Sequence, residues 1–145
     1  MNLDEVVDIW IADSKVDETE LSRESLKTPL LHAKYLKMYS EEAVKLKSLY
    51  VKRKRIQNTL NAYYKGDLNN PEDLKEIDRE PWSRKVLRQE VQEYVDADED
   101  MVKINIRIGY QEEIVSALKE IIKAINTRGF AIKNAIDFLK WSGGG

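Results

Sequence analysis

The feature that most constrains this chain is an uninterrupted stretch from Leu30 to Lys65 that contains neither glycine nor proline. Thr28-Pro29 precedes it with a capping hydroxyl and a proline suited to the first helical position, and Gly66 follows as a stop signal. These signals predict a helix over 29–65, about 55 Å long at 1.5 Å per residue. A helix of this length needs a partner helix, from the same chain or another. We therefore expect an all-α fold.

One side of this predicted helix forms a seam, in which positions follow one another at alternating steps of three and four. Seven of its ten members are apolar or aromatic, which favours coiled-coil-like packing. The seam consists of His32, Tyr35, Tyr39, Glu42, Leu46, Leu49, Arg53, Ile56, Leu60 and Tyr63. His32 is the only histidine of the chain, and its place on the seam favours a packing role over a catalytic one.

A second run of apolar residues predicts a closing helix at about 109–141. Its stripe is too long to leave in water, so we expect it to be the oligomerisation surface, with packing inside the chain as the competing explanation. The residues of this stripe are Ile114, Leu118, Ile121, Ile125, Ile132, Ile136 and Leu139.

The remaining segments are expected to belong to one domain that spans residues 1–145. An acidic arm covers 1–27, the basic long helix 28–66, and a loop with one helical turn 67–83, followed by a short helix over 84–95. Residues 101–108 alternate isoleucine with polar side chains, which is typical of a strand. Because no second strand pattern exists to pair with it, helical and extended interpretations both stay open. Residues 142–145 are expected to form a flexible tail.

Charge is distributed unevenly, although the net charge is only −2. Residues 27–66 hold ten bases and two acids, between two acidic segments. Such a basic segment could track phosphates while tyrosines stack on unpaired bases, and the competing interpretation is a solvated helix face. The candidate DNA-binding residues are Lys45, Lys47, Lys52, Arg53, Lys54, Arg55, Tyr63 and Tyr64.

Several functional classes lack support in the sequence. Cysteine is absent, which removes disulfides and thiolate metal sites. Neither GxxxxGK[ST] nor GxGxxG occurs, and no apolar run reaches the roughly 20 residues that span a bilayer. We expect no catalytic residue, no cofactor, no metal and no membrane partner. Asp96, Asp98 and Asp100 suggest a metal-dependent hydrolase, but a solvated loop or the approach to a helix explains these acids better.

A distinctive motif, INTRGFAIK, stands at 125–133, preceded by Tyr110 and by ADEDMVK at 97–103. The amino half contains AKYL at 33–36 and ends the long helix with Tyr63-Tyr64-Lys65-Gly66, and Asp17, Thr19, Leu21 and Glu24 precede them. On these residues the chain resembles the phage recombination mediator family UvsY, over roughly 17–66 and 95–141. One departure is that the family's basic pair ahead of the tyrosines falls on Asn58 and Leu60, while Lys54 matches a base.

This resemblance implies a non-enzymatic, ring-like homo-oligomer, of six or seven subunits, in the cytoplasm of the infected host cell. Its implied partners are single-stranded DNA, a RecA-like phage recombinase and the phage single-strand-binding protein. Its implied role is to load the recombinase onto DNA covered by that protein, in recombination, repair and recombination-dependent replication. The alternative hypothesis is a coiled-coil scaffold or assembly protein that does not bind nucleic acid. Arg128 and Lys133 are the reserve candidates for DNA contact.

Overall fold

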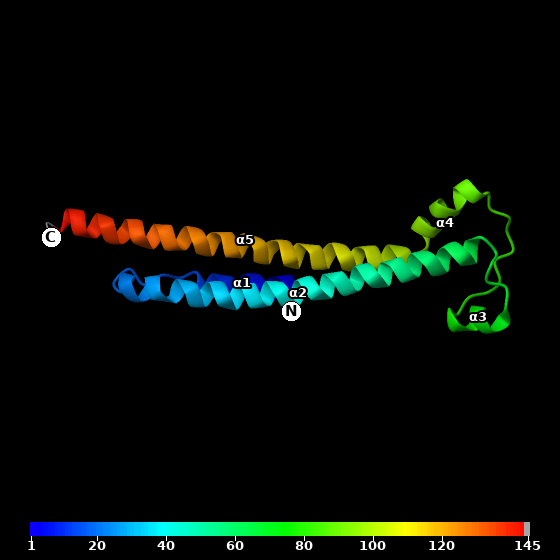
Figure 1. Cartoon of the computed structure of the whole chain (residues 1–145), viewed down its shortest axis with the longest axis horizontal. Helices are drawn as coiled ribbons and strands as arrows, with labels where there is room; N and C mark the ends of the chain where they lie inside the picture. Colours follow the sequence, from blue (N-terminus) through cyan, green and yellow to red (C-terminus); the bar gives the residue numbers. More distant parts are fainter. Residues whose placement is uncertain (144–145) are drawn as a thin grey trace. The chain divides into compact units, whose positions relative to one another are not determined.

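The computed structural model describes residues 1–143, and every element among them is helical (Figure 1). The order along the chain is α1 (Leu3–Asp13), α2 (Leu21–Tyr64), α3 (Pro71–Glu76), the 3₁₀ helix η1 (Arg88–Glu90), α4 (Val91–Ala97) and α5 (Glu99–Ser142). The absence of strands from this part of the chain confirms the all-α prediction. None of these helices is both long and apolar enough to span a membrane. The expected tail at 142–145 falls partly outside the described residues.

The chain divides into two compact units, and α2 and α5 each contribute to both. Unit 1 contains Met1–Lys45 and Gln111–Gly145, and unit 2 contains Leu46–Tyr110. Each unit has a hydrophobic core of its own. The expectation of one recombination-mediator-like domain over 1–145 stays a prediction.

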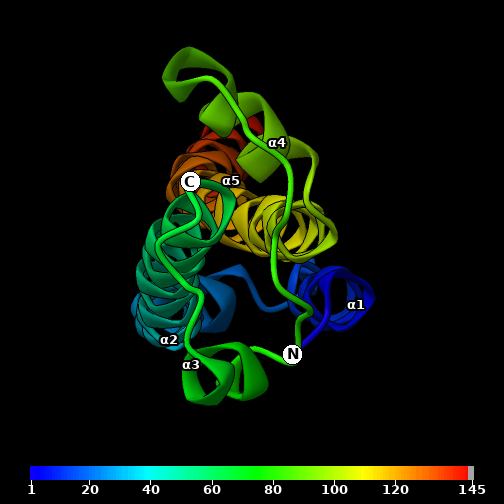
Figure 2. The ribbon, with the colours of Figure 1, turned by 90° about the vertical axis from the view of Figure 1, so that its right-hand side faces the viewer.

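In unit 1, α1 packs against the first half of α2 and the middle of α5 (Figures 1 and 2). A capping box starts α1, because the Asn2 side chain accepts from the Glu5 backbone and Glu5 accepts from the Asn2 backbone. Trp10 meets Tyr35 edge to face at 5.5 Å between ring centroids. The buried members of this core are Val6, Tyr35, Met38, Ile114, Leu118, Ile121 and Ile125.

Unit 2 is built from the end of α2, the beginning of α5 and α4. Arg53 donates to the Asn105 side chain at 3.2 Å, and the Gln57 and Gln92 amides exchange hydrogen bonds of 2.8 and 3.1 Å. Because Tyr64 contacts Asp98 while Arg53 contacts Asn105, α2 and α5 run antiparallel within this unit. The buried core consists of Leu60, Val91, Val95, Met101, Ile104 and Ile108.

α2 begins at Leu21, not at Pro29 as the Thr-Pro pair predicts. Pro29 lies inside the helix with its ring exposed, although proline removes one helical hydrogen bond there. Arg128 of α5 donates to the Thr28 hydroxyl and to the Glu24 carbonyl oxygen in the turn just before the proline. These tertiary hydrogen bonds support the helix at the position where local sequence signals would start it. The predicted end is confirmed, because Gly66 follows α2 with a φ of +82°.

α5 begins at Glu99, ten residues before the predicted start of the closing helix. Asp98 caps it by accepting the Asp100 backbone N–H at 2.9 Å. Residues 101–108 belong to α5 and therefore settle on the helical interpretation. Their burial follows helical spacing, because Ile104 and Ile108 are buried one turn apart while Ile106 is exposed.

The helical turn predicted within 67–83 is confirmed as α3. The short helix predicted over 84–95 begins later, at η1 and α4.

Candidate nucleic-acid interface

Most of the basic residues predicted on the long helix present free charge. Lys47, Lys52, Lys54 and Arg55 are exposed on the part of α2 that belongs to unit 2. No ion pair joins them to an acid within residues 1–143. Four cations of this kind attract a polyanion, because none is already neutralised by the protein.

Lys45 and Arg53 differ from this group because both have partners. Lys45, in unit 1, binds Glu42 at 3.0 Å, and this hydrogen bond and the charge of Glu42 raise the pKa of Lys45. Arg53 is half-buried, bonds to Asn105 and lies over the Tyr50 ring at 5.3 Å. Both side chains therefore already contribute to the fold.

Tyr63 and Tyr64 belong to an aromatic cluster with Trp82 and Tyr94. Tyr64 lies at the centre, with ring centroids 5.1 Å from Tyr63, 4.7 Å from Trp82 and 5.6 Å from Tyr94. Tyr63 is buried and donates its hydroxyl to the Glu80 carbonyl oxygen at 2.7 Å. The rings of Tyr63 and Tyr64, which we expected to stack on DNA bases, thus already have protein partners.

An ion pair fixes the polar edge of this cluster. Arg79 donates two hydrogen bonds to the Asp98 carboxylate, at 2.7 and 2.8 Å, and Tyr64 donates a third at 2.6 Å. Burial tends to raise the pKa of Asp98, but these bonds and that from the Asp100 backbone outweigh burial and lower the pKa below its ordinary value. Burial and the bond to Asp98 raise the pKa of the Tyr64 hydroxyl. The oxygens of Asp98, one of the three acids considered for a hydrolase, are therefore already engaged.

Two adjoining hollows in unit 2 bring bases of α5 next to those of α2. One, of about 340 Å³, is lined by Lys52, Ile56, Asp100, Lys103, Ile104 and Arg107. The other, of about 260 Å³, shares Lys52, Ile56 and Asp100 and adds Arg55. Sequence reasoning missed Lys103 and Arg107, because their meeting with α2 depends on how the two helices pair.

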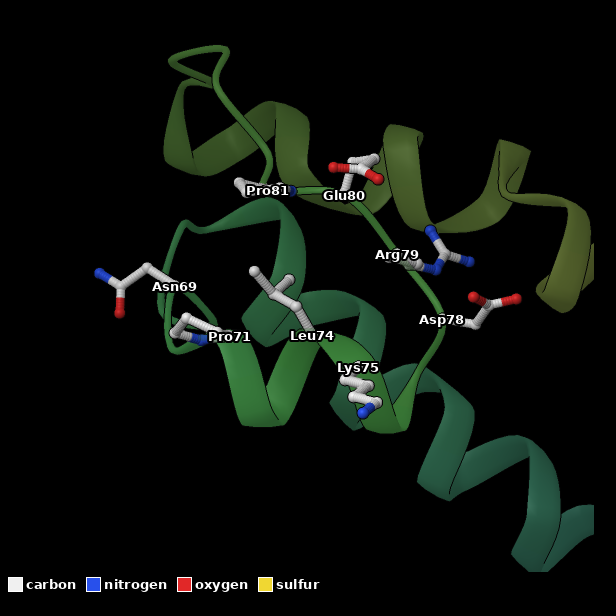
Figure 3. Close-up of a pocket in the computed structure, with 8 residues that line it drawn as sticks. All are labelled: Asn69, Pro71, Leu74, Lys75, Asp78, Arg79, Glu80 and Pro81. Atoms are coloured by element: carbon white, nitrogen blue, oxygen red, sulfur yellow. The ribbon is translucent and has the colours of Figure 1, made fainter.

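A further hollow of about 400 Å³ lies over α3 (Figure 3). Figure 3 shows Leu74 rising from α3 toward the segment that contains Arg79 and Pro81, and Leu74 is buried there. α3 gives way to this segment at Asp78, whose φ of +53° is a turn conformation that aspartate tolerates. This hollow contains none of the predicted DNA-binding residues.

The reserve candidate Arg128 is not accessible to DNA. Its guanidinium is buried in unit 1 against Glu24 and Thr28, whereas Lys133 is exposed. Asn58 and Leu60 occupy the positions where the resembled family has a basic pair ahead of the tyrosines. Leu60 lies in the core of unit 2, and Asn58 is exposed.

The stripe predicted for oligomerisation separates into two parts. Ile114, Leu118, Ile121 and Ile125 belong to the core of unit 1, and Ile132 is also buried. Ile136 is half-buried and Leu139 is exposed. Beyond the core, this end of α5 presents other large apolar side chains to solvent, namely Phe130, Phe138 and Trp141.

Three comparisons relate the chain to known proteins. A model of the family described as "Recombination, repair and ssDNA binding protein UvsY" matches residues 9–145. The recombination protein uvsY of Enterobacteria phage T4 is 24% identical over 144 residues, which cover 99% of each protein. Among solved structures, the bacteriophage T4 recombination mediator protein UvsY in lattice type II has a TM-score of 0.85, with 22% identity, over 99% of this chain and 98% of that chain. The same protein in lattice type I has a TM-score of 0.83, with 21% identity, over 95% of this chain and 98% of that chain. These structures share the fold of this chain.

Proposed function

The chain belongs to the UvsY family of recombination, repair and ssDNA-binding proteins, and from this premise we propose that it is a recombination mediator. It binds single-stranded DNA and promotes the loading of a RecA-like phage recombinase onto DNA covered by the phage single-strand-binding protein. It acts in phage recombination, repair and recombination-dependent replication, in the cytoplasm of the infected host cell. The proposal includes no catalytic step.

The observation that carries this proposal is the group of four unneutralised bases on α2, namely Lys47, Lys52, Lys54 and Arg55. Lys and Arg side chains that contact phosphates release counterions, so they supply binding that does not depend on sequence. A mediator requires binding of this kind, because it must act wherever single strands arise. Lys45 and Arg53 add positive charge to the same helix, while Lys45 stays paired with Glu42 and Arg53 stays bonded to Asn105.

Tyr63 and Tyr64 take a supporting role in the proposal. Their rings pack on Trp82 and on each other, and Tyr63 is bonded to Glu80. The cluster holds the end of α2 in place, and contact with a base falls to Tyr64, which is half-buried where Tyr63 is buried.

We propose that subunits associate through the end of α5 into a ring-like homo-oligomer, of six or seven subunits by family resemblance. The exposed side chains of Phe138, Leu139 and Trp141 supply an apolar contact surface. Repetition of the basic site around an oligomer raises its effective concentration, so one strand engages several subunits. Distortion of the strand along such a path loosens the single-strand-binding protein and leaves room for the recombinase.

Fluorescence anisotropy with a labelled oligothymidylate tests the proposal. The test variant replaces Lys47, Lys52, Lys54 and Arg55 with Gln, and spares Arg53 because it contributes to the fold. A matched control removes the same charge from four exposed bases of unit 1, Lys15, Arg23, Lys37 and Lys119. We expect the test variant to bind more weakly, with a log–log salt slope shallower by up to about 2.8, since each phosphate that a base neutralises adds about 0.7 to the slope.

The control variant should retain most of the affinity and the slope. Failure of the unmodified protein to bind single strands at low salt would instead favour the scaffold hypothesis. A recombinase filament assay on DNA precoated with single-strand-binding protein then tests mediation, because the test variant should delay filament formation more than the control does.

A further inference from the structure

We propose that the two adjoining hollows of unit 2 form one cationic groove in which Lys103 and Arg107 of α5 bind the phosphates of a single DNA strand opposite Lys52 and Arg55 of α2. The inference rests on the proposed function and deepens it, because it adds phosphate contacts from a helix outside the basic segment. "Cationic groove" denotes these two hollows and the four bases on their walls.

The two hollows are continuous because they share three of their lining residues, Lys52, Ile56 and Asp100. Arg55 borders one hollow, and Lys103 and Arg107 border the other. Lys52 and Arg55 are three residues apart on α2, and Lys103 and Arg107 are four apart on α5. Each pair therefore presents its two charges about one helical turn apart along its own wall.

The charge of the cationic groove is positive after its ion pairs are considered. Asp100 is engaged by Arg79 at 2.9 Å, and Lys103 binds Glu99 at 2.9 Å. The Lys103–Glu99 pair is exposed on both sides, so it is weak and can be exchanged for a phosphate. No acid is paired with Lys52, Arg55 or Arg107 within the described residues 1–143.

The floor of the cationic groove is apolar. Ile56 lines both hollows, Ile104 lines one and Leu60 the other. Aliphatic side chains give sugars and base faces van der Waals contact without selecting among bases. Basic walls over an apolar floor suit a single strand, whose phosphates carry charge at regular intervals and whose bases are unpaired. An acidic peptide has the negative charge of such a strand but lacks the unpaired bases that would contact the apolar floor.

The first test is a double variant on α5, Lys103→Gln with Arg107→Gln, which removes two positive charges and is examined in the full chain. Its control is Lys119→Gln with Lys123→Gln, which removes the same charge from exposed positions of the same helix in unit 1. Lys123 also matches Lys103 in pairing with an exposed glutamate. We expect the groove variant to bind labelled oligothymidylate several-fold more weakly, with a salt slope shallower by about 1.4. The control should match the unmodified protein in affinity and slope.

Two outcomes of the DNA titration would overturn the proposal while leaving the proposed function in place. One is unchanged affinity and slope in the groove variant, in a preparation where the unmodified protein binds. The other is an equal loss in the control, which would reduce the effect to net charge. Loss of binding to a labelled deca-glutamate peptide, with DNA binding intact, would also overturn it and assign the groove to an acidic protein partner.

A second test does not depend on affinity, and uses the fact that the chain contains no cysteine. Thr59→Cys places a single thiol in the lining of the groove, and Ser116→Cys places one on an exposed part of α5 in unit 1. We expect oligothymidylate to slow alkylation of the first thiol at least several-fold and to leave the second unaffected. Equal alkylation rates at position 59 with and without saturating DNA would contradict the proposal.

Discussion

Arg128 of α5 and Glu24 of α2 form a buried ion pair, with 2.7 Å between Nη2 and Oε2 and with side chains only 7% and 5% exposed. The same guanidinium donates through Nη1 to the Glu24 carbonyl oxygen at 2.9 Å and to the Thr28 hydroxyl. The bonds to Glu24 join positions 104 residues apart in the chain, and the bond to Thr28 joins positions 100 apart. The motif INTRGFAIK at 125–133 thus contributes its arginine to the fold of unit 1.

Removal of this arginine should destabilise the protein severely. In Arg128→Met the Glu24 carboxylate stays buried and keeps only its pair with the exposed Lys27, at 2.8 Å. Breaking a buried ion pair from one side costs about 3–5 kcal/mol, and we expect a loss of this order. Urea unfolding followed by circular dichroism measures the loss. Lys133→Met, an exposed base five residues further along α5, serves as the matched control and should change stability by less than about 0.5 kcal/mol.

The double variant Glu24→Leu with Arg128→Met separates a lost pair from a stranded charge. Because it removes both buried charges, it should recover much of the stability that Arg128→Met loses. A double variant no more stable than the single one would mean that the hydrogen bonds to Thr28 and to the Glu24 carbonyl oxygen matter more than the ion pair.

Acid should weaken unit 2 through Asp98. The pKa of this carboxyl is lowered in the folded protein by Arg79 and Tyr64, whereas in the unfolded chain it is about 3.9. The resulting stability is therefore complete above about pH 5, and it is lost as the pH falls below about 3.9 and through the folded pKa. Urea midpoints between pH 7 and pH 3 measure this loss.

The variant Asp98→Asn identifies the group responsible. It should be less stable than the unmodified protein at pH 7, and its stability should fall less between pH 5 and pH 3. Asp96→Asn, at an exposed position two residues earlier, should keep the original pH dependence. Identical acid sensitivity in the Asp98→Asn variant and the unmodified chain would place the titrating group elsewhere.

Association should depend on the exposed end of α5. Phe138 and Trp141 are 64% and 83% exposed, so replacing both with Ser removes apolar contact surface without opening the core of unit 1. We expect a smaller mass in light scattering, with helicity unchanged. Leu87→Ser removes a comparably exposed apolar side chain from unit 2 and should leave the mass unaltered. A full-size oligomer in the double variant would exclude this surface.

The sequence predicted the buried faces of the long helices well, because burial follows helical spacing. Tyr35, Leu60 and Tyr63 lie on the predicted seam and are buried. Ile114 and Leu118 were also predicted to avoid water, and they do so within the core of unit 1. Spacing identifies which side chains leave water, but it does not say which surface covers them.

The features missed by the sequence analysis depend on contacts between distant segments. α2 begins seven residues before its strongest local start signal, since Arg128 supports the turn before Pro29. The partners of Tyr64 include Trp82 from a loop and Tyr94 from α4. Lys103 and Arg107 reach the α2 bases through the antiparallel pairing of α2 with α5, which no local pattern encodes.

The central claim, that phosphate charge holds a single strand on this protein, is tested most directly by the salt dependence of binding by the unmodified chain. Labelled oligothymidylate is titrated by anisotropy at several salt concentrations between about 50 and 200 mM, the range over which counterion release changes affinity strongly. We expect log affinity to fall linearly with log salt at a steep slope, equally for oligonucleotides of different sequence. Absence of binding at about 50 mM, or an affinity that does not change across the range, would contradict the account.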